Sequence, residues 1–128
     1  MQAPAKLTST AAVLLVKDVA ASARYYQEKL GFACDNIFGD PPSFCIVHRD
    51  GCELMLAQAE AKHVIPHWTV RDKTCNVYFW VSDADALHRE FVGRGATMDY
   101  GPCDQPYGCR EFGIQDADGY DISFGQLV

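Results

Sequence analysis

Short apolar runs and amphipathic stretches follow one another along this chain in an order that occurs twice. In the first half, the Val- and Leu-rich run at 11–17 predicts a strand, and residues 20–30 carry apolar side chains at helical spacing. Asp18 before this helix and Gly31 after it are typical start and stop residues. Three further apolar runs predict strands at 32–38, 43–48 and 52–57. The first half therefore has the predicted order βαβββ.

The same order begins again after a connector at 58–74. The pattern predicts a strand at 76–81, a helix at 84–94, a strand at 96–100 and a terminal hairpin that turns at 116–119. The second half is therefore a second βαβββ unit.

Turn and cap residues support the repeat, because they correspond in pairs: Asp18 with Asp83, Gly31 with Gly95, and Gly51 with Gly119. The wider spacing of the last pair places roughly four extra residues in a loop at 101–108 of the second half. We therefore expect an α+β fold in which two βαβββ modules form curved mixed sheets around a concave cavity. The expected organisation is a single domain over 1–128, with modules at 8–57 and 75–126 joined by the connector at 58–74.

Composition narrows the function classes. The chain has 128 residues, of which 48% are hydrophobic, and a formal net charge of −6. An acidic chain lacks the basic patch that a nucleic-acid partner requires. No apolar stretch approaches the length of a membrane span, and the start of the chain has no signal-peptide pattern, so we expect a cytoplasmic protein without membrane contact. The six cysteines form no CxxC pair and are expected to be free thiols.

Several motifs together resemble the vicinal-oxygen-chelate superfamily, which includes glyoxalase I, ring-cleaving dioxygenases, fosfomycin-resistance enzymes and bleomycin-resistance proteins. They are Val-Lys-Asp at 16–18 before a helix, Leu-Gly-Phe at 30–32 after it, Gln-Pro-Tyr-Gly-Cys-Arg-Glu-Phe at 105–112, and Asp-Ala-Asp-Gly at 116–119. The resemblance covers residues 8–126, and the 105–112 segment is most similar to the bleomycin-resistance type. It implies the two-module fold and a homodimer.

Catalytic members of that superfamily hold a divalent metal with side chains from four strand positions. The resemblance places Ala11, Glu53, Asn76 and Ser123 at these positions. A methyl group cannot coordinate a metal, Asn and Ser are weak neutral ligands, and only Glu53 is a good one. We therefore predict no metal site and no cofactor.

The histidines offer no substitute site. His63 and His67 are four residues apart, but Pro66 between them argues against the helix that would place both rings on one face. We interpret both as exposed connector residues.

Strand alternation assigns each side chain to a face of its sheet. In the second half the cavity face is predicted to carry aromatic and polar residues: Asn76, Tyr78, Trp80, Glu111, Asp121 and Ser123. In the first half it is predicted to carry Val13, Leu15, Ser43, Cys45, Val47, Glu53 and Met55. The opposite face is wholly apolar and is predicted to pack on the helices: Leu14, Val16, Phe44, Ile46, Leu54, Leu56, Val77, Phe79, Phe112, Ile114, Ile122 and Phe124. Tyr107, in the loop before the last hairpin, is the best candidate to stack on a flat ligand.

These residues favour a metal-free small-molecule-binding protein that sequesters a cationic or aromatic ligand and performs no chemistry. Aromatic walls would stack on planar groups, and Glu53, Glu111 and Asp121 would attract a positive charge. The same carboxylates could instead be rim residues paired with Arg or Lys side chains. Tyr78 and Trp80 could equally pack between sheets or between subunits.

Two other functions remain open at the level of sequence. One is a glyoxalase-type lyase or isomerase, or a dioxygenase-like enzyme, with Glu53 as its general base. The other is a non-catalytic domain whose surface around Trp68 and Trp80 only mediates oligomerisation.

Overall fold

The protein folds into two four-stranded sheets and two helices, seen in a computed structural model that describes residues 3–128. Met1 and Gln2, which belong to the expected domain, lie outside the described residues. The elements are β1 (Ala12–Val16), α1 (Val19–Leu30), β2 (Ile37–Phe38), β3 (Phe44–Arg49), β4 (Cys52–Gln58), β5 (Val77–Trp80), α2 (Ala84–Arg94), β6 (Thr97–Gln105), β7 (Cys109–Gln115) and β8 (Asp121–Leu127). Two short 3-10 helices, Ala61–His63 and His67–Thr69, lie in the connector.

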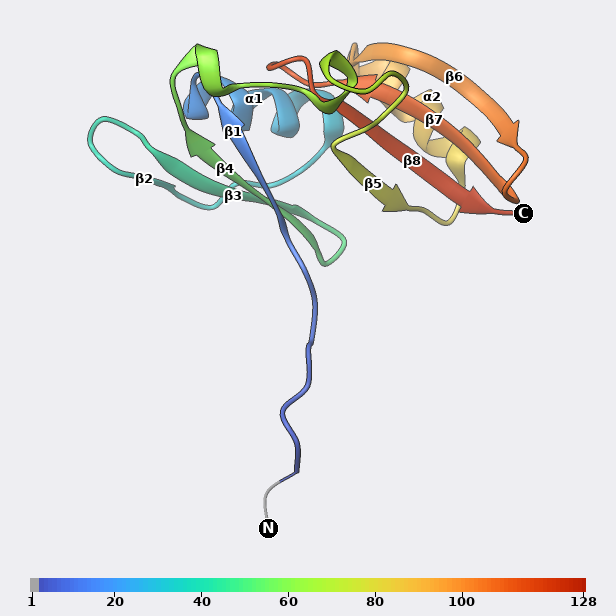
Figure 1. Ribbon diagram of the computed structural model, residues 1–128, viewed down its shortest axis with the longest axis horizontal. Helices are drawn as coiled ribbons and strands as arrows, with labels where there is room; N and C mark the ends of the chain where they lie inside the picture. The colour runs from blue at the N-terminus through green and yellow to red at the C-terminus, as the bar shows by residue number, and fades with distance from the viewer. Residues whose placement is uncertain (1–2) are drawn as a thin grey trace.

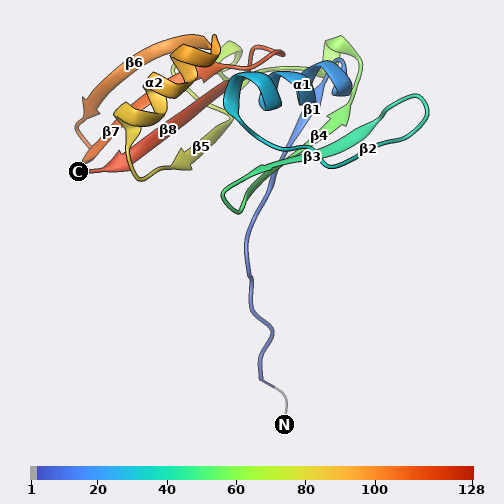
Figure 2. The ribbon, with the colours of Figure 1, turned by 180° about the vertical axis from the view of Figure 1, so that it is seen from behind.

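Each sheet is built from one half of the chain. The strand orders are β1-β4-β3-β2 and β5-β8-β7-β6, so the first and last strands of each half are neighbours. These two neighbouring pairs are parallel and the other pairs are antiparallel. The two sheets lie side by side in Figure 1, and both helices lie behind them, as the reverse view in Figure 2 shows. The expected α+β fold with two βαβββ-like modules is confirmed.

The helix ends follow the capping residues that the sequence indicates. The side chain of Asp18 accepts a hydrogen bond from the backbone N–H of Ala21 at 3.0 Å, and Asp83 does the same for Ala86 at 3.0 Å. Gly31 ends α1 with a φ of 69°, in the left-handed region that favours glycine. These caps satisfy N–H groups that a helix start leaves without partners.

The core lies between the helices and one face of each sheet. In the second module, Phe112 and Phe124 stack at 5.2 Å, and Phe91 of α2 meets Phe124 edge-on at 5.1 Å. The core face predicted for β5, β7 and β8 is confirmed, because their apolar alternate residues are buried or packed on this cluster: Val77, Phe79, Phe112, Ile114, Ile122 and Phe124. The other face of each sheet is left open on the near side in Figure 1.

The predicted faces of β3 are wrong. Cys45 and Val47, expected on the open face, are fully buried in the core. Cys45 lies opposite Leu56 and Val47 opposite Leu54, so all four share the helix-facing side. Phe44 and Ile46 therefore point to the open face. Residues 44–47 are all apolar, so periodicity within them could not fix the phase.

Two element boundaries also differ from the sequence prediction. The expected strand at 32–38 is reduced to Ile37–Phe38 plus an isolated bridge between Ala33 and His48. The expected loop at 101–108 is mostly strand, because β6 continues to Gln105. The extra residues are absorbed as register shifts between Met98 and Cys103. This edge strand tolerates such bulges, and Pro102 within them, because its outer side needs no hydrogen bonds to a neighbouring strand.

The turn between β7 and β8 forms hydrogen bonds that connect the second module to the first. Asp116 accepts a hydrogen bond from the hydroxyl of Tyr26 on α1 at 2.7 Å. Asp118 accepts one from the hydroxyl of Ser22 and one from the backbone N–H of Lys17 at 2.9 Å. Both carboxyl groups are buried, and Asp116 also accepts the N–H groups of Asp118 and Tyr120. Burial raises the pKa of Asp116 to about 6.

The segment before β1 runs away from the two sheets in both views (Figures 1 and 2). Leu7 within it is fully exposed. Among the described residues, neither helix combines the length and apolar character that crossing a bilayer demands.

Candidate functional site

The open face of the second sheet carries an aromatic surface. Tyr78 and Trp80 are alternate residues of β5, and their rings meet edge-on at a centroid distance of 5.0 Å. Trp80 is 63% exposed, and Tyr107, in the turn before β7, is also 63% exposed. Exposed Trp and Tyr rings present large flat areas to a ligand. We call Tyr78, Trp80, Tyr100 and Tyr107 the aromatic face.

Two glycines set the depth of this face. Gly125 of β8 lies opposite Trp80 in the sheet register, and a Cβ atom there would overlap the ring of Tyr78. Gly113 of β7 lies opposite Tyr100, whose ring would overlap a Cβ in the same way. The two tyrosine rings therefore lie directly on the sheet backbone, in space that no other residue would leave free.

Glu111 lies beneath the aromatic face and holds two of its phenols. Its side chain is only 4% exposed, and its two carboxylate oxygens accept hydrogen bonds from the hydroxyls of Tyr100 and Tyr107. The hydrogen bond to Glu111, together with burial, raises the pKa of Tyr107 to about 12. Burial, and then the Glu111 contact, also raises the pKa of Tyr100. Both phenols therefore stay protonated donors, and the carboxylate has its main acceptor positions filled.

The other predicted residues of this sheet have structural partners. Ser123 Oγ lies 3.2 Å from the hydroxyl of Tyr100, and Asp121 accepts a hydrogen bond from the amide of Gln115 at 3.0 Å. Asn76 lies just before β5, where its side-chain oxygen accepts the backbone N–H of His67 at 2.9 Å. The hydroxyl of Tyr78 is buried without a hydrogen-bond partner among the described residues.

Glu53 belongs to a different surface, on the open face of the first sheet. It lies opposite His48 in the register of β3 and β4, and His48 Nε2 lies 3.3 Å from a carboxylate oxygen of Asp35. A pocket of about 250 Å³ opens here, lined by these three residues with Phe38 and Ile46 among its apolar walls. The structure thus separates Glu53 from the second-sheet residues with which it was expected to share a cavity wall.

The structure adds residues that the sequence did not single out. Tyr100 was missed because the bulges of β6 break the period-2 pattern on which face assignment depends. The place of His48 beside Glu53 follows from the register set by the turn at Asp50 and Gly51. The pairing of two short strands across a tight turn is the signal that could have found it.

Metal-ligating side chains do not converge in the described part of the chain, residues 3–128, where no group of three or more His, Cys, Asp or Glu could hold an ion. His63 and His67 are exposed and fall in separate short helices on either side of Pro66, as the proline predicts. The position matching the first metal ligand of the superfamily is the methyl side chain of Ala11.

The comparison with protein families gives one match over most of the chain. The model described as the Glyoxalase/Bleomycin resistance protein/Dioxygenase superfamily matches residues 8–124. No curated protein matches the sequence significantly.

Several solved structures share the fold. A bleomycin-binding protein from bleomycin-producing Streptomyces verticillus, in complex with copper(II)-bleomycin, is 32% identical; the match covers 94% of this chain and 97% of that chain, with a TM-score of 0.69. A glyoxalase-related enzyme from Clostridium phytofermentans is 18% identical over 99% of this chain and 100% of that chain, with a TM-score of 0.79. TnmS3, an antibiotic binding protein from Streptomyces sp. CB03234, is 22% identical over 98% and 100%, with a TM-score of 0.70.

Proposed function

The chain belongs to the glyoxalase/bleomycin resistance protein/dioxygenase superfamily, and we propose that it is a binding protein that sequesters a flat small molecule without chemical change. The ligand would lie on the aromatic face of the second sheet. The relative at 32% identity binds copper(II)-bleomycin, and another neighbour is an antibiotic binding protein, which supports an antibiotic-type ligand for this chain as well.

One observation carries the proposal: a sheet face with four aromatic rings is left uncovered. A packed sheet buries such rings, whereas here Trp80 and Tyr107 are each 63% exposed. Glycines beneath Tyr78 and Tyr100 keep the face flat. A flat surface with exposed indole and phenol rings suits stacking, where each aromatic pair contributes about 0.5–1.5 kcal/mol.

The charge near this face favours a cationic ligand. Glu111 lies below the rings of Tyr100 and Tyr107, and its negative charge adds to the negative potential of their faces. Asp121 is buried at the start of β8. Burial, and then the nearby Asp121 carboxylate, raises the pKa of Asp99. The binding free energy of a cationic ring system on these rings would be about 0.5–2 kcal/mol more favourable than that of a neutral one of the same shape.

A second candidate function rests on the pocket around Glu53. Glu53 and His48 are cross-strand neighbours, and Asp35 lies within 3.3 Å of the imidazole. A carboxylate beside an imidazole could move a proton from a carbon acid, which suits the lyase or isomerase alternative. Turnover that is lost in both Glu53→Gln and His48→Gln would favour this enzyme over the binding protein.

Ligand titration tests the proposal. Trp68→Phe leaves Trp80 as the single tryptophan, so that all tryptophan fluorescence comes from a residue of the aromatic face. We expect a cationic polyaromatic compound and copper(II)-bleomycin to quench it saturably, and Trp80→Ala to weaken binding about tenfold by an independent method such as calorimetry. Added salt should weaken binding of the cationic compound only slightly, because Glu111 is buried and salt screens buried charges less than exposed ones.

The matched control is Trp68→Ala. The Trp68 indole donates a hydrogen bond to the carbonyl of Gly119 at 2.6 Å, away from the aromatic face, so its removal should leave affinity unchanged. Absence of saturable binding by any flat compound would reject the proposal and leave the oligomerisation function.

A further inference from the structure

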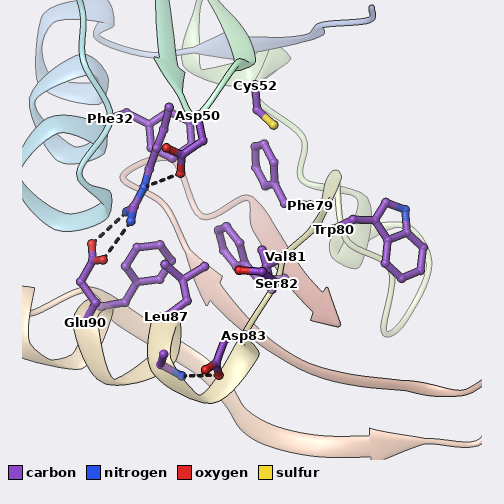
Figure 3. A pocket seen from close by; sticks show the side chains of 14 residues that line it. Phe32, Asp50, Cys52, Phe79, Trp80, Val81, Ser82, Asp83, Leu87 and Glu90 are labelled. Carbon is purple, nitrogen blue, oxygen red and sulfur yellow. Dashed lines mark hydrogen bonds and ion pairs between the residues drawn. The ribbon is translucent and has the colours of Figure 1, made fainter. Parts of the chain in front are cut away.

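A second pocket lies between the two modules, on the opposite side of β5 from the aromatic face. Its volume is about 510 Å³, within the range of roughly 300–1,000 Å³ typical of small-molecule sites. Figure 3 shows Phe79 in its middle, Glu90 and Asp50 at one end, and the Trp80 ring pointing away from Phe79. Neighbouring residues of a strand point to opposite faces, so Phe79 lies inside this pocket, whereas Trp80 belongs to the aromatic face and only borders the pocket.

Phenylalanine rings from both modules form the apolar floor of this intermodule pocket. Phe79 stacks on Phe124 at a centroid distance of 5.3 Å and an angle of 11°, and Phe32 of the first module meets Phe79 edge-on at 5.9 Å. Phe91 and Leu87 of α2 complete the apolar lining. The pocket thus lies over core rings of both modules, of which Phe79 is the most accessible.

The charges around the rim are already paired within the protein. Arg49 forms two hydrogen bonds with Glu90, at 2.8 and 2.9 Å, and donates a third to the carbonyl of Leu30 at 2.8 Å. Asp50 lies 3.5 Å from the same guanidinium, and Asp83 is occupied in capping α2. The rim therefore selects against an ionic ligand, since a bound ion would have to break one of these pairs.

We propose that the intermodule pocket is a second ligand site, which takes an uncharged, flat, hydrocarbon-rich ring system. Its neutral polar groups are the Ser82 hydroxyl and the Cys52 thiol, both on exposed residues, so one neutral hydrogen bond can orient the ring. This site lies beyond the proposed function. It differs from the aromatic face in position, in its lining by phenylalanine and in its indifference to ligand charge.

The neutral fluorophore N-phenyl-1-naphthylamine is the probe for this site. We expect saturable binding to the full chain with one probe per pocket and no change when salt is added, because no charge pairing is involved. Ala86→Phe places a ring in the pocket from α2 and should weaken binding about tenfold or more. Val92→Phe adds the same ring to an exposed position of α2 outside the lining and should leave binding unchanged.

Two further measurements separate the pocket from other apolar surfaces. Tyr107→Ala, which lies outside the pocket lining, should impair cation binding on the aromatic face and leave naphthylamine binding intact. Bound naphthylamine should also slow alkylation of Cys52, read by peptide mass mapping, with Cys34 in the same chain as the control. Equal naphthylamine affinity in a folded Ala86→Phe variant, or unprotected Cys52 at saturation, would overturn the proposal.

Discussion

Glu111 accepts a hydrogen bond from the hydroxyl of Tyr107, four residues earlier in the chain. The buried carboxylate thereby holds the exposed Tyr107 ring in place. The second oxygen of Glu111 holds Tyr100 in the same way. The acidic residue that the sequence marked as a ligand contact is thus engaged by two tyrosines of the aromatic face.

Glu111→Gln should weaken cationic flat ligands more than neutral ones. The amide has a single acceptor oxygen, so one tyrosine loses its partner, and the negative charge beneath the rings is removed. We expect about tenfold weaker binding of a cationic ligand and about twofold weaker binding of a neutral one. Calorimetric titration of both compounds measures this, with the exposed Glu60→Gln as the control. Unchanged affinities for both would show that Glu111 has no part in binding.

Asp116→Asn should change how stability depends on pH. The folded-state pKa of Asp116, about 6, lies above the ordinary value of 3.8, so the fold favours the protonated carboxyl. The protonated carboxyl stabilises the fold fully below about pH 4, and this stabilisation is lost as pH rises through about 6. The free energy of unfolding falls by roughly 3 kcal/mol over that range. The asparagine variant cannot ionise, so relative to wild type it should gain stability between those limits.

Urea unfolding of both proteins across that pH range measures the difference. Asp72→Asn, at an exposed position, is the control and should track the wild type. A wild-type and Asp116→Asn difference that stays constant with pH would contradict the expectation.

The Arg49–Glu90 pair should couple the modules energetically. Its side chains are 26% and 34% exposed, so solvent screening limits the expected coupling to about 1 kcal/mol in a double-mutant cycle with Arg49→Met and Glu90→Gln. The Lys62–Glu60 pair in the connector is far more exposed and should show no measurable coupling. Equal coupling for the two pairs would argue against an interface role for Arg49.

We expect the protein to purify without a stoichiometric divalent metal. Ala11 cannot coordinate, and Asn76 and Ser123 are both engaged in hydrogen bonds within the protein. Elemental analysis after mild purification tests this expectation. One tightly held Zn, Mn or Fe per chain would contradict it.

We also expect a homodimer. The open faces expose large apolar side chains, with Val13 at 59% and Phe38 at 53%, which isolated domains usually cover. Light scattering at micromolar concentration should give twice the chain mass of 14.2 kDa. Val13→Glu should shift the mass toward the monomer, and a wild-type monomer would reject the expectation.

The pattern of a strand predicts its faces most directly where polar and apolar residues alternate. In β8, Asp121 and Ser123 alternate with Ile122 and Phe124, so the pattern fixed the phase correctly. In β3 the run is apolar on both faces, because its open face carries Ile46 where a solvated strand would carry a polar residue. There the phase comes from pairing with β4, which a local pattern does not contain.

The grouping of the site residues was harder to predict than their faces. The alternation of side chains along each strand predicts that Glu53 and Glu111 both point to open faces. It contains no information on how the two sheets are placed relative to each other. The structure shows Glu53 beside His48 and Glu111 beneath Tyr107. The intermodule pocket was beyond prediction for the same reason, since Phe32 and Phe79 come from different modules.

The turn that fastens the last hairpin to the first helix has a consequence for protein synthesis. Ser22 is 96 residues away from Asp118 in the chain, so α1 leaves the ribosome long before its partners exist. Tyr26 is fully buried in the folded protein, and its hydroxyl can form its hydrogen bond only after Asp116 has been synthesised. A nonsense mutation just before Asp116 would remove only the final turn and strand of the second half. It would nevertheless leave the first half without its partners, and the truncated chain should be a substrate for cellular proteases along its whole length.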